Sequence, residues 1–422
     1  MITLDDARLQ RAVAAQPARL APSALSPFED AKGWLERSPA SPLADASLRS
    51  CLYICVVSGF LVSIQPAPYD LIFLLLCFIC LIARVSFDRG LVPIVLLLTI
   101  LQLAGLASAL PVLDDSDVWN FMGISIYLAI TVPVFGAILT QDTERRLNTY
   151  RKAVVFSAVI AAVLGMIGYF QLIPQYEMFM MNNRAVATFK DPNGFGPYLI
   201  PPLLLTLERF VKGEVRPLNL IASLLIATGL LLSFSRGAWG NFVLSFAVML
   251  SLMFVTATGP QDRKRIVVFV LVGLVAVLVL FGILYSIESV RDMLLQRARL
   301  VQEYDTGTSG ARFNVQRAAI TEILQNINGM GGWVFGKLYG LVTHNSYLGA
   351  FVNHGWIGGF AYIGLVLTTI YAGFRFSLVR TPWQGPLIAV FCSFIGLAAE
   401  SFIVDSVDGR LLYELLGVVW GL

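Results

Sequence analysis

The chain has 422 residues, of which 57% are hydrophobic and 14% are charged, whereas a soluble domain carries about 25% charged residues. A soluble fold of this length could not bury so much apolar surface, and a net charge of +3 provides no basic face for a nucleic acid. The composition therefore predicts an all-α, polytopic integral membrane protein whose surroundings are the lipid bilayer, with no nucleic acid as partner.

The first 49 residues form a separate segment that is rich in Ala, Pro and Ser and carries balanced charge. This composition is typical of a disordered tail. It is also much longer than the short basic segment that precedes the apolar core of a cleavable signal peptide. We therefore expect residues 1–49 to be a cytoplasmic N-terminal tail.

Apolar segments fill most of the remaining chain, and a spanning helix needs about 20 such residues. We predict about twelve transmembrane helices: nine within 50–286, a long periplasmic loop at 287–344, and three more within 345–422. Pro201 and Pro202 should kink one of them. The predicted spans are 50–66, 69–83, 91–111, 118–139, 153–173, 196–207, 218–234, 238–256, 266–286, 345–373, 386–404 and 411–422.

Positive charges in the short loops predict the orientation of these spans. With the N-terminal tail in the cytoplasm, the inner loops hold fourteen Lys and Arg residues, whereas the short outer loops hold four. The inner loops are 84–90, 140–152, 208–217, 257–265 and 374–385. The asymmetry predicts a cytoplasmic N-terminus and an outer position for residues 287–344.

This outer loop contains two stretches in which apolar residues recur with helical spacing. Residues 287–294 form the first, and residues 311–327, between Ser309 and Gly329, form the second. We predict two short amphipathic helices that lie across the mouth of the membrane bundle.

Two polar segments interrupt the apolar runs on the outer side. Residues 182–196 carry Arg184 and Asn193 and lead into the kinked span. Irregular backbone at membrane depth is tolerated only where it lines a cavity or is buried in protein. Ser235-Arg236-Gly237 is a tight turn in which the arginine either extends to lipid phosphates or lies in a polar pocket. The neighbouring hydroxyls and glycine favour the pocket.

One further arginine and the two histidines are also candidates. Arg312 lies in the first turn of the second outer helix, where free amides attract an anion, so a phosphate clamp and a solvated arginine are both open. His344, beside Asn345, stands at the outer rim of a span, where an imidazole titrates near neutral pH. His354 lies deeper beside Gly355, and we expect it to pack or to form a helix–helix hydrogen bond.

Two other patterns lack the context they need. Residues 331–337 match most of a phosphate-binding P-loop, but Leu338 replaces the required Ser or Thr, and no parallel sheet is predicted. The acidic turn at 114–117 is typical of an exposed loop, although such turns also occur in metal-dependent glycosyltransferases. We predict no metal site.

Four motifs in this order resemble the O-antigen ligase and polymerase superfamily of bacterial membrane glycosyltransferases. They are Arg184…Thr188-Phe189…Pro192-Asn193, Ser235-Arg236-Gly237, Arg312 in the long outer loop, and His344-Asn345…Gly355-Trp-Ile-Gly358. The resemblance covers roughly residues 180–375, and His354 departs from the expected pattern.

The resemblance implies a transfer reaction at the periplasmic face of the bacterial inner membrane, without cofactor, metal or nucleotide sugar. A glycan on undecaprenyl diphosphate would pass to a hydroxyl of an acceptor glycan or of lipid A–core. The implied catalytic residues are Arg236 and Arg312, which would stabilise the leaving diphosphate, and His344, which would accept or orient the hydroxyl proton. The implied substrate-binding residues are Arg184, Asn193 and Asn345.

Three functions remain open at this point. A polymerase that lengthens an exopolysaccharide on its lipid carrier is favoured by analogy, through the extended tail and the compact outer loop; other polysaccharide assembly proteins would then be further partners. An O-antigen ligase would break the same bond but use lipid A–core as acceptor. A polysaccharide transporter would instead show two related halves and ionisable groups near mid-bilayer, and His354 is the one candidate at such a depth.

Overall fold

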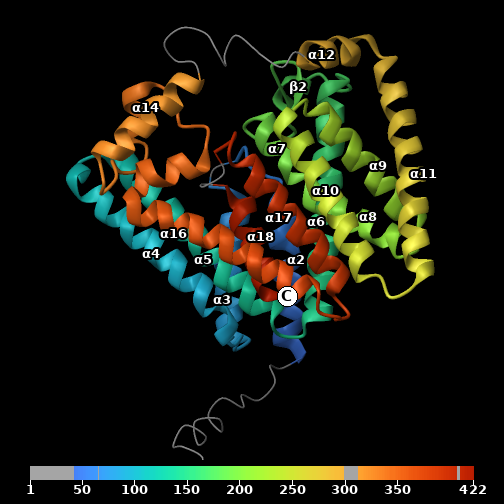
Figure 1. Ribbon diagram of the computed structural model, residues 1–422, viewed down its shortest axis with the longest axis horizontal. Helices are drawn as coiled ribbons and strands as arrows, with labels where there is room; N and C mark the ends of the chain where they lie inside the picture. Colours follow the sequence, from blue (N-terminus) through green and yellow to red (C-terminus); the bar gives the residue numbers. More distant parts are fainter. Residues whose placement is uncertain (1–41, 65, 299–311, 406–408) are drawn as a thin grey trace, which may run out of the picture. The chain divides into compact units, whose positions relative to one another are not determined.

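The computed structural model describes residues 42–64, 66–298, 312–405 and 409–422, and these residues are mainly helical (Figure 1). The first helices are α2 (Pro42–Ser58), α3 (Pro68–Ile82), α4 (Val92–Ala109), α5 (Ser116–Leu139) and α6 (Thr143–Tyr169). Two-residue strands β1 (Met180–Met181) and β2 (Arg184–Ala185) follow, then α7 (Pro192–Tyr198), α8 (Ile200–Val211), α9 (Pro217–Leu232), α10 (Arg236–Thr256) and α11 (Pro260–Tyr285). The last are α12 (Glu288–Ala298), α14 (Arg312–Gln325), α15 (Val334–Tyr339), α16 (Ser346–Ser377), α17 (Gln384–Glu400) and α18 (Arg410–Gly421).

A helical segment lies at each position where we predicted a span. Six of the described helices are long and apolar enough to cross a membrane by themselves, and three more apolar helices are shorter. The protein is therefore a mainly helical, multi-pass membrane protein, as the predicted all-α class requires, while the number of twelve spans stays a prediction. Helix α2 begins at Pro42, eight residues before the predicted span, and the rest of the predicted N-terminal tail lies outside the described residues.

The expected kink divides one predicted span into α7 and α8. Pro201 and Pro202 have no N–H to donate to the carbonyl groups four residues earlier, so two bonds of the helical ladder are missing. The break falls at Leu199, and the helix on its outer side begins early because Asp191 caps it.

Helices that are distant in sequence pack side by side, notably α4 with α16, α5 with α18, and α10 with α17. Most residues of α17 and α18 are buried. The opposite case is α11, in which only Ile266 and Leu284 are buried. A helix that is apolar all round and so little covered by protein fits contact with lipid.

Contacts between loops show which loops lie at the same end of the bundle. The Gln141 Nε2 donates to the Ser86 Oγ (2.6 Å) at one end, and Lys337 pairs with Asp115 (2.6 Å) at the other. We name these the inner and outer ends, after the predicted loops that meet there. The pairing agrees with alternating spans, while the end that faces the cytoplasm stays a prediction from the charge count.

The outer segment contains the two predicted helices, α12 and α14, and a third, α15, that the spacing did not predict. Helix α14 packs through Val315 and Ala319 against Phe335 and Val352. These small residues allow α14 to lie close to α16. Ile323 is partly buried and packs against this cluster. Four other large apolar residues of the predicted helix are at least half exposed, namely Phe313, Ile320, Leu324 and Ile327.

Helix α16 is broken at Gly355, whose φ of +68° lies outside the helical region. The loop after α14 enters this break. The Met330 N–H donates to the Val352 carbonyl (2.8 Å), and the Trp356 N–H donates to the Ile327 carbonyl (2.9 Å). In an unbroken helix the Trp356 N–H would donate to the Val352 carbonyl. Because the helix is broken, both groups bond to the outer loop instead, and they attach this loop to a membrane helix.

Candidate active site

The Ser-Arg-Gly turn joins α9 to α10 at the outer end. Phe234 has a φ of +46°, which is uncommon for a bulky residue. Ser235 caps α10, because its Oγ accepts from the Ala238 N–H (3.3 Å). Arg236, the first residue of α10, is partly exposed. The Ser235 cap and the left-handed Phe234 thus fix the backbone conformation on the N-terminal side of Arg236.

Arg184 and Asn193 hold this turn from the neighbouring segment. Arg184 is 8% exposed, and its guanidinium donates to the Ser233 carbonyl (2.8 Å) and to the Asn193 Oδ1 (3.3 Å). The same Oδ1 accepts from the Ser235 Oγ (2.9 Å). Strand β2, helix α7 and the Ser-Arg-Gly turn therefore meet at the Asn193 side chain.

Glu400, the last residue of α17, is a carboxylate that our sequence analysis missed. It is 4% exposed, and its Oε2 accepts from the Asn241 Nδ2 of α10 (2.7 Å). Its Oε1 has no hydrogen-bond partner among the described residues and lies 2.8 Å from where a Cβ on Gly237 would stand. The carboxylate thus occupies the space beside the glycine of the turn. An ionisable residue at the end of an apolar span was the available signal.

His344 lies directly before α16 in left-handed backbone, with a φ of +48°. Asn345 caps α16, since its Oδ1 accepts from the Leu348 N–H (3.0 Å). The Ser346 N–H donates to the Ser401 carbonyl (2.8 Å). The histidine loop is therefore joined to the residue that follows α17, and α17 links it to the Ser-Arg-Gly turn.

Five of the six predicted site residues accordingly lie at the outer end, around the starts of α7, α10 and α16 and the end of α17: Arg184, Asn193, Arg236, His344 and Asn345. The sixth, Arg312, begins α14, and its side chain lies outside the part of the chain that the structure describes. Gln316, one turn further, donates to the Thr343 carbonyl (3.4 Å). Helix α14 is therefore attached to the His344 loop.

His354 is 1% exposed and packs inside the bundle. Its ring centroid is 5.9 Å from that of Phe121 in α5, and a Cβ on Gly105 in α4 would stand 2.6 Å from its Cδ2. Neither ring nitrogen has a hydrogen-bond partner among the described residues. Within that part of the chain, His354 packs as expected but forms no interhelical hydrogen bond.

The acidic turn and the P-loop-like pattern meet in an ion-pair cluster. Lys337 of α15 pairs with Asp115 and Asp117 at 2.6 and 2.7 Å. The bond from Lys337 lowers the pKa of the Asp115 carboxyl, and its bonds to Asp115 and Asp117 raise the pKa of the lysine. These charges attach α15 to the start of α5.

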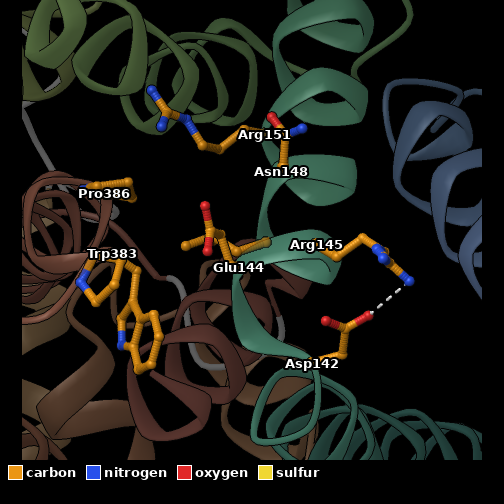
Figure 2. A pocket seen from close by; sticks show the side chains of 9 residues that line it. Asp142, Glu144, Arg145, Asn148, Arg151, Trp383 and Pro386 are labelled. Carbon is orange, nitrogen blue, oxygen red and sulfur yellow. Dashed lines mark ion pairs between the residues drawn. The ribbon is translucent and has the colours of Figure 1, made fainter.

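A cavity of about 540 Å³ lies at the inner end, between the start of α6 and the segment that precedes α17. Figure 2 shows Glu144 toward its centre and Arg145 turned to Asp142, 3.5 Å away. Arg151, which also lines it, pairs with Glu208 (2.9 Å). None of the described candidate residues lines this cavity, so its volume does not mark the candidate active site.

The fold thus defines a multi-pass membrane protein, and the candidate arginine and histidine residues that the structure describes lie at one end of its helices. Residues 221–363 match the family model described as O-antigen ligase, and this match supports the resemblance of the chain to the O-antigen ligase and polymerase superfamily. The matched range includes Arg236, Arg312 and His344, whereas Arg184 and Glu400 lie outside it. No curated protein matches the chain. The family indicates a ligase- or polymerase-type glycosyltransferase.

Proposed function

We propose that the protein is a polymerase of lipid-linked polysaccharide repeat units in the bacterial inner membrane. It transfers glycan from undecaprenyl diphosphate to a hydroxyl of an acceptor sugar at the periplasmic face. The observation that carries this proposal is that the Arg236 turn and the His344 loop contact adjacent residues, Glu400 and Ser401, at the end of α17.

The chemistry follows from the residue types. The acceptor oxygen forms a bond to the anomeric carbon, and the bond from that carbon to the phosphate oxygen breaks, with its electron pair leaving on the diphosphate. Arg236 and Arg312 bind the diphosphate through paired N–H donors and stabilise its developing charge. His344 takes or orients the hydroxyl proton. This assignment requires no metal ion and no nucleotide sugar.

The neighbouring residues support these groups. The buried Arg184 positions the turn that carries Arg236, through its bond to the Ser233 carbonyl. Asn193, which is exposed beside the turn, contacts the donor. Asn345 caps α16 and thereby fixes the backbone next to His344. We assign Asn345 a second role, in binding the substrate.

An O-antigen ligase is the second candidate, because the matched family carries that description. A ligase breaks the same anomeric bond and differs in the acceptor, which is lipid A–core. The arginine and histidine roles are the same in both reactions, so the acceptor decides between them.

The test uses the purified full chain in lipid nanodiscs, with lipid-linked repeat units isolated from the producing cells and with a metal chelator present. A ladder of lengthened glycans on a gel supports the polymerase. Product that forms only after lipid A–core is added supports the ligase. An unchanged substrate with both acceptors, in protein shown to be folded, contradicts both proposals and favours a transporter.

A further inference from the structure

A small cavity opens at the outer end between α5, α15 and α16, apart from the Ser-Arg-Gly turn. It holds about 30 Å³, which is the space of one or two water molecules. Its lining combines aromatic rings with a carboxylate, an amide and a hydroxyl: Phe121, Trp333, Phe335, Asp405, Asn353 and Thr343.

Trp333 presents a fixed aromatic surface at this cavity. It is 46% exposed, and its ring meets that of Phe121 edge to face, with centroids 6.3 Å apart and an interplanar angle of 86°. Its φ of +67° is strongly disfavoured for a bulky side chain. Strain of this kind persists where the surrounding structure holds it and is concentrated at binding sites.

The polar side of the cavity is kept open by Gly349 of α16. A Cβ at this position would stand 3.2 Å from the Thr343 Oγ1 and 3.4 Å from the Asp405 Oδ2. Thr343 also donates to the Asn345 carbonyl (3.0 Å) and directly precedes His344. The cavity therefore borders the loop that carries the proposed proton acceptor.

We propose that this cavity and the face of Trp333 form the subsite for the acceptor sugar, a proposal that rests on the proposed function. The C–H bonds on one face of a pyranose ring carry a slight positive charge and pack on the negative face of an aromatic ring. The sugar hydroxyls donate to the Asp405 carboxylate or to the Thr343 oxygen, and they accept from the Asn353 amide. Since the cavity holds only about 30 Å³, one hydroxyl or hydroxymethyl group enters it, and the ring itself stacks on Trp333.

This placement separates the two substrates. The donor diphosphate lies at the arginines, and the acceptor lies on the α15–α16 side, with its reacting hydroxyl toward His344. Such a division suits a transferase, because each substrate is oriented by its own groups before the bond forms.

The test measures binding of a probe that has neither lipid nor phosphate: oligosaccharide fragments of the producing strain's own polysaccharide, released by mild acid. Binding to the full chain in nanodiscs is followed by saturation-transfer NMR. Trp333→Ala and Asp405→Asn should each weaken binding about tenfold or more, since one well-placed interaction of about 1.4 kcal/mol changes an equilibrium constant tenfold. Trp333→Phe should retain most of it.

Trp119→Ala is the matched control, because Trp119 in α5 is also 46% exposed and does not line the cavity. Equal binding by the wild type and the Trp333 and Asp405 variants would overturn the subsite, even if glycan transfer proceeds. Binding that depends on Trp333 and Asp405 would support the subsite even if no transfer occurs, in which case the proposed function fails and the sugar site stands.

Discussion

The two ends of the bundle both carry arginines, but their polar groups form different mixtures of contacts. At the inner end, some ion pairs join residues three or four positions apart, such as Arg145 with Asp142, and others join distant segments, such as Arg151 with Glu208. At the outer end, the described bonds around the Ser-Arg-Gly turn join different elements, and the bond from Asn241 to Glu400 joins residues 159 positions apart. Pairs at helical spacing stabilise one helix wherever it lies. Bonds between distant segments instead fix side chains relative to one another, as a catalytic site requires.

The same comparison shows that the larger of the two cavities does not lie at the end of the bundle that carries the candidate site residues. The cavity of about 540 Å³ is at the inner end (Figure 2), whereas the family motifs converge at the outer end, where the described cavity holds about 30 Å³. Groups that are already oriented contribute more to transfer than empty space does. The arrangement of the polar groups is therefore the better guide to the site.

The first prediction, with an all-or-none difference in cysteine labelling, tests which end of the bundle faces outward. In a background without the five native cysteines, Lys190→Cys should react fully with an impermeant thiol reagent added to intact spheroplasts. Gln261→Cys, at the start of α11, should react only after the membrane is permeabilised. The opposite labelling would reverse the orientation and move the proposed reaction to the cytoplasmic face.

Loss of His344 should give the largest effect on activity. His344→Asn retains a residue that tolerates left-handed backbone but cannot accept the proton, so turnover should fall by about 100-fold to 10,000-fold. Binding of the lipid-linked donor should persist. Chain length on a gel and donor binding by filter assay measure the two quantities. Normal turnover in His344→Asn would exclude the histidine as proton acceptor.

Loss of Arg236 should reduce transfer by about 100-fold to 1000-fold, since one oxyanion contact is removed. Lysine should restore little of it, because a point charge does not reproduce bidentate geometry. Arg145→Ala, an exposed arginine of the inner end, is the control and should transfer normally. Equal activity of the two alanine variants, at equal protein levels in the membrane, would erase the distinction between the ends.

The Gly237–Glu400 contact should have a smaller effect, on stability. Gly237→Ala places a methyl group against the carboxylate, and overpacking of this kind costs about 1–3 kcal/mol, against about 1 kcal/mol gained from the better helix former. Adding Glu400→Ser should restore part of the melting temperature lost in the single variant. Glu400→Gln, which keeps the size, should not. Additive effects in the double variant would mean that the two residues do not interact.

Loss of the exposed ion pairs of Lys337 should change the melting temperature least. The pKa of Asp115 is lowered in the folded protein, so its contribution is complete above its unfolded pKa and is lost as the pH falls through the lowered value. The pKa of Lys337 is raised, so its contribution disappears only as the pH rises through that raised value. The small difference in melting temperature between wild type and Lys337→Gln should therefore persist at neutral pH and vanish in acid. A difference that is unchanged in acid would contradict this account.

Local sequence patterns were enough to predict the helical class, the positions of the helical segments and the resemblance to the family. Apolar runs, turn residues and short motifs are local properties, and each can be interpreted without knowing what packs beside it. The kink is an example, because Pro201 and Pro202 remove ladder bonds in any surroundings.

The contacts between distant residues, in contrast, became known from the tertiary structure. Val315 and Ala319 form the buried face of α14, together with the partly buried Ile323, while Phe313 and Leu324 stay exposed. Glu400 could not be assigned to the site from its position in the chain, since its neighbour Gly237 comes from another helix. The loop of Met330 fills the break in α16 for the same reason. Such contacts depend on how distant segments fit together, and local patterns carry no information about that fit.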